Sequence, residues 1–142
     1  METRIYALTD SHQEARNLSL LLSGIADFEK ENNTPFLLLD CGDLFKGIYA
    51  KDLIVNAYLK FKELYPQAQI VLGLGNNDFG FNQNDFDYLK SAMKKFSNAG
   101  INFVCANLKQ NNKYSNLCQR YKIININEKK YLLRHFVCKL PL

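Results

Sequence analysis

The stretch that decides the fold is FLLLDCGD, residues 36–43. Its four consecutive apolar residues indicate a buried β-strand, and the glycine and aspartates that follow indicate a tight polar loop. Residues 4–9 and 69–72 have the same design, because each apolar run leads into a loop that contains aspartate, asparagine or glycine. Residues 101–105 are expected to form a fourth strand.

The segments between these strands carry apolar residues at three- and four-residue spacing, which is typical of one face of an amphipathic helix. This spacing predicts helices over residues 14–30, 52–64 and 85–96. Strands that alternate with helices of this length favour right-handed βαβ crossovers. We therefore predict an α/β fold, with a mainly parallel βαβαβαβ sheet and helices on its faces.

The end of the chain follows a different pattern. Residues 119–127 and 130–140 are two strand-like segments separated by Glu128 and Lys129, which predicts a C-terminal antiparallel hairpin. With 142 residues and 47% apolar content, the chain suits a single domain spanning residues 1–142. Because the last strand ends without a polar tail, we expect this domain to be incomplete.

The sequence also indicates the location of the protein and the state of its cysteines. No apolar run approaches the length of a membrane span, and no leader follows Met1, so we expect a cytoplasmic protein without a membrane partner. The four cysteines, at positions 41, 105, 118 and 138, form no Cys-x-x-Cys pair. Reduced core thiols therefore explain them better than a zinc ribbon does.

The net charge of +4 is unevenly distributed. Residues 1–108 hold 10 basic and 13 acidic side chains, whereas residues 109–142 hold 8 basic and 1 acidic side chain. An acidic body suits a cation site, and the basic end suits a polyanion. Because lysine and arginine also guard sheet edges, and no motif of a known nucleic-acid module is present, we favour the solvated edge over nucleic-acid binding.

Polar residues end three successive strands, at Asp10-Ser11-His12, Gly42-Asp43 and Gly75-Asn76-Asn77-Asp78. Adjacent strands lie about 4.8 Å apart, so side chains at their carboxyl ends can meet at one or two metal ions. Carboxylate, imidazole and amide ligands suit Mn, Fe, Zn or Mg. The two glycines would let the backbone turn sharply and approach a ligand.

These motifs, Asp-x-His, Gly-Asp and Gly-Asn-x-Asp in this order, resemble the signature of calcineurin-like metallophosphoesterases. Residues 39–47, 76–80 and 101–108 are similar to segments of the 5'-nucleotidase branch. The resemblance covers most of residues 4–108. It implies the N-terminal half of a metallophosphoesterase αββα sandwich, and a hydrolase that acts on a phosphate ester or nucleotide in nucleotide catabolism.

The resemblance also implies a ligand set for two divalent metal ions. In that scheme Asp10 and His12 bind the first metal, Asp43 bridges both, and Asn76 binds the second. Two such cations activate a water molecule near neutral pH and neutralise the phosphoryl oxygens during in-line attack.

Asn77 and Asp78 fall on the catalytic positions of the same motif, where the family normally has histidine followed by an acidic residue. An asparagine can bind a phosphate but cannot donate a proton as an imidazolium does. The family's downstream histidine ligands have no match, since His135 is the only histidine besides His12 and is expected to have a surface or hydrogen-bonded role.

Three hypotheses about function follow. In the first, the chain is a metal-dependent phosphatase or nucleotidase whose remaining ligands come from a partner chain or a missing C-terminal segment. In the second, it is a degenerate fragment of such an enzyme without catalytic activity. In the third, it is an interaction module that uses the basic surface of residues 109–142.

Overall fold

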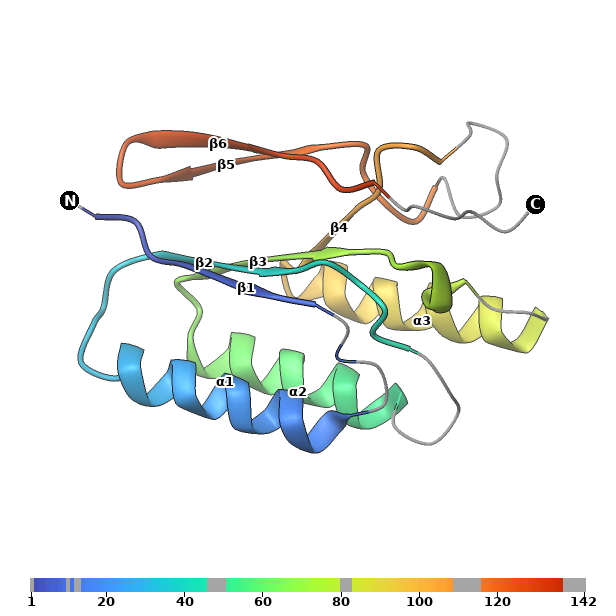
Figure 1. Ribbon diagram of the computed structural model, residues 1–142, viewed down its shortest axis with the longest axis horizontal. Helices are drawn as coiled ribbons and strands as arrows, with labels where there is room; N and C mark the ends of the chain where they lie inside the picture. Colours follow the sequence, from blue (N-terminus) through green and yellow to red (C-terminus); the bar gives the residue numbers. More distant parts are fainter. Residues whose placement is uncertain are drawn as a thin grey trace.

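The computed structural model describes residues 2–9, 11, 14–45, 51–79, 83–108 and 116–136. Strands and helices alternate through most of this part of the chain (Figure 1). In chain order the elements are β1 (Ile5–Leu8), α1 (Ala15–Glu29), β2 (Phe36–Asp40), α2 (Lys51–Leu64), β3 (Ala68–Gly73), a 3₁₀ turn η1 (Asn76–Asp78), α3 (Gln83–Asn98), β4 (Asn102–Val104), β5 (Lys122–Ile126) and β6 (Lys129–Leu133).

Strands β1 to β4 form a parallel sheet in the order β1-β2-β3-β4, which confirms the predicted α/β fold. We expected helices on the faces of this sheet, and the structure places them on one face only. All three helices lie on one face of the sheet, and the β5–β6 hairpin lies over the other (Figure 1). Each right-handed crossover steps to the next strand in the same direction, so every helix is placed on the same side.

The main core lies between the sheet and the helices. Phe36 and Leu38 of β2 point to this side, where they pack with residues such as Leu18 of α1 and Tyr58 of α2. All four side chains are at most 1% exposed. The sequence periodicity of the helices is therefore explained by one continuous apolar layer beneath the sheet.

A second, smaller core lies on the hairpin side of the sheet. Leu37 and Val71, which alternate with the residues of the first core, pack there against Ile124 and Ile126 of β5. Because both faces of β2 and β3 are covered, these strands are mostly apolar, with Asp40 and Gln69 as the exceptions.

The antiparallel hairpin is confirmed, but its turn lies one residue earlier than predicted. Asn127 and Glu128 form it, and both have positive φ angles, of 50° and 66°. A two-residue hairpin turn with positive φ at both positions matches the twist of the flanking strands. The last part of the second predicted strand, residues 137–140, lies outside the described residues.

An ion pair joins the edge of the sheet to the end of α1. The carboxylate of Glu29 accepts hydrogen bonds from Arg4 Nε (2.6 Å), Arg4 Nη2 (2.8 Å) and the Tyr6 hydroxyl (2.7 Å). The side chain of Glu29 is fully buried, whereas that of Arg4 is 28% exposed. The stability of the fold depends on this cluster, because removing one partner would leave a buried charge uncompensated.

We predict that Glu29→Ala lowers the free energy of unfolding by about 3 kcal/mol, because it deprives Arg4 and Tyr6 of their shared acceptor. The matched control is Glu63→Ala, which breaks the exposed pair between Lys60 and Glu63 and should cost less than about 0.5 kcal/mol. Urea denaturation of both variants measures the difference. Equal losses would show that the Glu29 cluster has no special role.

Candidate functional site

The loops that follow β2 and β3 meet at the carboxyl edge of the sheet. Gly42 and Gly75 lie at the contact, where a Cβ on Gly42 would come within 2.2 Å of the Gly75 nitrogen. A Cβ on Gly75 would come within 2.1 Å of Oδ1 of Asp43. Both positions require glycine, and Gly42 also has a φ of 98° that few other residues tolerate.

One buried carboxylate holds the two loops together. Oδ2 of Asp78 accepts hydrogen bonds from the backbone N–H groups of Asp43 and Gly75, both at 2.8 Å. Oδ1 of Asp78 accepts a third from the N–H of Phe45 at 2.7 Å. A single side chain after β3 therefore fixes the backbone after β2 on both sides of Leu44.

Burial raises the pKa of Asp78 to about 7, and the nearby charge of Asp43 acts in the same direction. The three backbone N–H donors oppose this effect, because hydrogen bonds to a carboxylate favour its ionised form. Asp78 is only 4% exposed, so its oxygens face the loops rather than solvent.

Asp43 presents its carboxylate at the centre of this edge. Its backbone lies in the left-handed region, with φ of 59°, a conformation that aspartate and asparagine tolerate better than most residues. Its Oδ1 accepts a hydrogen bond from the N–H of Asn77 (2.8 Å), and its Oδ2 accepts one from the Asn77 side-chain amide (2.9 Å). Each carboxylate oxygen has two lone pairs, so acceptor capacity remains on both.

A second buried carboxylate, that of Asp40, binds the backbone of the loop that follows β2. Its Oδ1 accepts the N–H of Gly42 at 2.9 Å, and its Oδ2 accepts the Tyr58 hydroxyl at 2.5 Å. Burial and the adjacent charge of Asp40 raise the pKa of Tyr58 well above its ordinary value, so the phenol stays a donor. Sequence reasoning assigned no role to Asp40 or Tyr58, since no motif signals a contact across 18 residues.

The structure brings together the predicted residues of the second and third strand ends. Asn76 begins η1 and is exposed, Asn77 is half-buried against Asp43, and Asp78 lies beneath them. The predicted ligands Asp10 and His12 lie outside the described residues. Within the described ranges, no three histidine, cysteine, aspartate or glutamate side chains gather in a way that could hold a metal ion.

His135 has a hydrogen-bonded role, as expected. Its Nε2 lies 3.0 Å from the carbonyl oxygen of Leu74, and its ring lies against Gly73, where a Cβ would come within 2.8 Å of it. Its own carbonyl oxygen accepts the N–H of Ala106 at 2.7 Å. These contacts join the end of β6 to the ends of β3 and β4, on the hairpin side of the sheet.

A family model for calcineurin-like phosphoesterases matches residues 3–137. The chain belongs to the calcineurin-like phosphoesterase family. Proteins of this family hydrolyse phosphate esters with divalent metal ions, and the parallel sheet with its hairpin is consistent with such a domain. A search of curated protein sequences gave no match.

Of the predicted ligands, the described part of this calcineurin-like phosphoesterase domain contains Asp43 and Asn76. The Asp43 carboxylate keeps spare acceptor capacity while it contacts Asn77, and the neighbouring Asn76 is exposed, so both are oxygen donors of the kind that hard cations prefer. The hydroxyl of Ser11, between the two predicted ligands of the first strand end, is buried without a hydrogen-bond partner among the described residues.

No helix in the described part of the chain is both long enough and apolar enough to cross a membrane.

We predict that Gly42→Ala and Gly75→Ala each lower the free energy of unfolding by at least about 2 kcal/mol, because a methyl group would force the two loops apart. Gly24→Ala is the control, since nothing lies within 4 Å of that Cβ on α1. There, alanine should raise stability by roughly 0.5–1 kcal/mol. Urea denaturation reports all three values, and a tolerated Gly42→Ala would contradict the described loop contact.

Proposed function

We propose that the chain is a metal-dependent phosphoester hydrolase of the 5'-nucleotidase type that uses two divalent metal ions, Mn, Fe, Zn or Mg. Its metal ligands are Asp10, His12, Asp43 and Asn76, and its substrate is a phosphate ester or nucleotide. The observation that carries the proposal is the position of Asp43. The Asp78 carboxylate binds the backbone N–H groups of Asp43 and Gly75, and thereby holds Asp43 next to the loop that contains Asn76.

Each described residue has a distinct part in this scheme. Asp43 would hold metal through its carboxylate, and Asn76 would do so through its amide oxygen. Asp78 is a positioning residue, because it contacts the backbone of Asp43 and Gly75 rather than the reacting groups. When bound, the metals supply a Lewis acid for the phosphoryl oxygens and lower the pKa of water.

Asn77 takes the place of the proton donor that the family normally has. Its side-chain amide donates to Asp43, which orients the carboxylate, but it has no ionisable proton to give to a leaving group. Loss of general acid catalysis typically costs about 10²–10⁴-fold in rate. Poor leaving groups such as a nucleoside alkoxide should suffer more than an activated aryl oxide.

A second candidate is a degenerate phosphoesterase that binds metal without turnover. It is favoured by one observation, that the Asn77 amide and N–H engage both oxygens of Asp43, the residue expected to bridge the metals. The two candidates differ in whether residues outside the described ranges, or a partner chain, supply the remaining ligands.

We predict that the chain binds Mn²⁺ at micromolar concentration, measured by titration calorimetry. Asp43→Asn should weaken binding at least about tenfold, because it removes the negative charge while asparagine tolerates the same backbone conformation. Asp87→Asn is the control, since Asp87 is an exposed carboxylate on α3 that contacts Gln83. Absent binding, or binding unchanged in Asp43→Asn, would remove both candidates.

A further prediction distinguishes the candidates. Asn77→His should raise turnover of an alkyl phosphate by about 10²-fold or more in Mn²⁺, because it restores a proton donor to the leaving group. An aryl phosphate with a good leaving group should gain much less, which makes it the internal control. If metal binds and neither substrate is turned over by either protein, the non-catalytic candidate is correct.

A further inference from the structure

An open pocket of about 310 Å³ lies at the base of the β5–β6 hairpin, apart from the candidate metal site. The described residues that line it are Ala106, Arg120, Tyr121, Arg134 and Phe136. None of these residues takes part in the chemistry proposed above.

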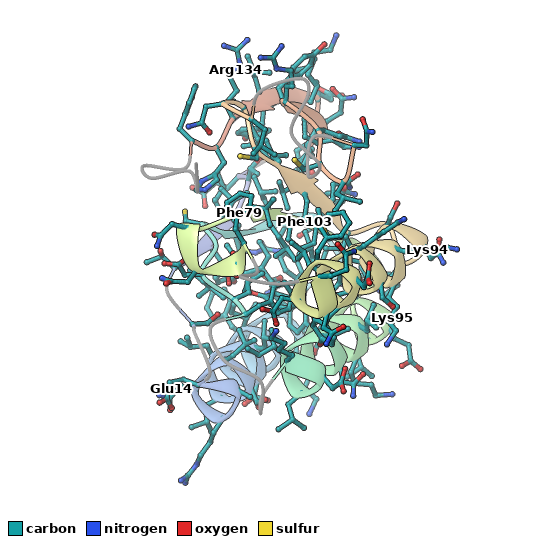
Figure 2. The ribbon with its side chains drawn as sticks, turned by 90° about the vertical axis from the view of Figure 1, so that its right-hand side faces the viewer. Glu14, Phe79, Lys94, Lys95, Phe103 and Arg134 are labelled. Atoms are coloured by element: carbon teal, nitrogen blue, oxygen red, sulfur yellow. The ribbon has the colours of Figure 1, made fainter. Side chains whose placement is uncertain are left out.

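The pocket opens away from the sheet. Leu133 packs toward the second core, and the ring of His135 lies against Gly73. Since side chains alternate along an extended segment, Arg134 and Phe136 face the opposite side. Figure 2 agrees, because Arg134 lies on the hairpin layer at the opposite end of the molecule from Glu14.

The pocket is positively charged. Among the described residues, neither Arg120 nor Arg134 forms an ion pair with a carboxylate. The only acidic residue between positions 116 and 136 is Glu128, at the opposite end of the hairpin in the β-turn. Two guanidinium groups that make no ion pair among the described residues suit an anion that can accept paired hydrogen bonds.

The pocket is also aromatic. Tyr121 is 52% exposed and Phe136 is 59% exposed, although both are large apolar side chains. Extending the strand register of Lys122 with Leu133 by one residue places Tyr121 opposite Arg134. Exposed rings beside arginines on a β-ribbon are the groups on which nucleic-acid bases stack while the phosphate is held by charge.

We propose that this pocket binds a nucleotide, with its base against Tyr121 or Phe136 and its phosphate between Arg120 and Arg134. The shared chemistry is an aromatic base that carries a phosphate, from either a free nucleotide or one unit of a single strand. A purely acidic ligand would leave the two rings unused. The site requires no metal, so its test does not depend on whether the phosphoesterase proposal is correct.

Binding is measured by fluorescence anisotropy in EDTA, with a labelled oligothymidylate as the direct probe and AMP as the competitor. Arg120→Gln and Arg134→Gln should each weaken binding about fivefold or more, and each should reduce the salt slope by about 0.7. Tyr121→Ala should weaken binding by about fivefold or more through lost stacking. Circular dichroism confirms that each variant is folded.

Lys94→Gln is the matched control, since it removes one positive charge from the exposed face of α3. It should leave the affinity unchanged. Competition by AMP supports the pocket with a free nucleotide as its ligand, whereas binding of the oligonucleotide alone supports the pocket with a strand as its ligand. The proposal would be overturned if no binding were detected. It would also be overturned if Lys94→Gln and Arg134→Gln lowered the affinity equally, because binding would then depend on overall positive charge and not on the pocket.

Discussion

The hydrogen bonds that the Asp78 carboxylate accepts from three backbone N–H groups are the interaction on which the candidate site depends. Two of them join residues that are 33 and 35 positions apart in the sequence, the third is with Gly75, and together they hold two loops in contact at the carboxyl edge of the sheet. Because the loops approach so closely, only glycine fits at Gly42 and Gly75. The position and backbone conformation of Asp43 follow from this packing.

Much of the fold and part of the site could be predicted from sequence, for physical reasons. The apolar run of residues 36–39 and the helical periodicities predicted the parallel sheet, and the shared edge of parallel strands predicted that the loops of Asp43 and Asn77 meet. Helix placement could not be predicted, since it depends on strand order rather than on any local pattern. Cys41, expected in the core, is exposed because it comes after β2 has ended.

The backbone contacts of Asp78 were also beyond sequence reasoning. Its place in the Gly-Asn-x-Asp motif indicated catalysis, whereas its contacts are with the backbone of the neighbouring loop.

The hairpin has one part that packs on the sheet and another that faces solvent. Ile124 and Ile126 of β5 complete a core with Leu37 and Val71, while the segments at the base of the hairpin present arginine and aromatic side chains to solvent.

We propose that the loops after β2 and β3, which Asp78 holds together, form a metal site. The most direct test of this is paramagnetic broadening of backbone amide resonances by Mn²⁺. Signal loss at substoichiometric Mn²⁺ should be strongest at Asp43, Asn76 and Asn77, and should be absent at the Asn127 turn of the hairpin. Broadening that is centred on another part of the chain, or that is uniform across it, would contradict the claim.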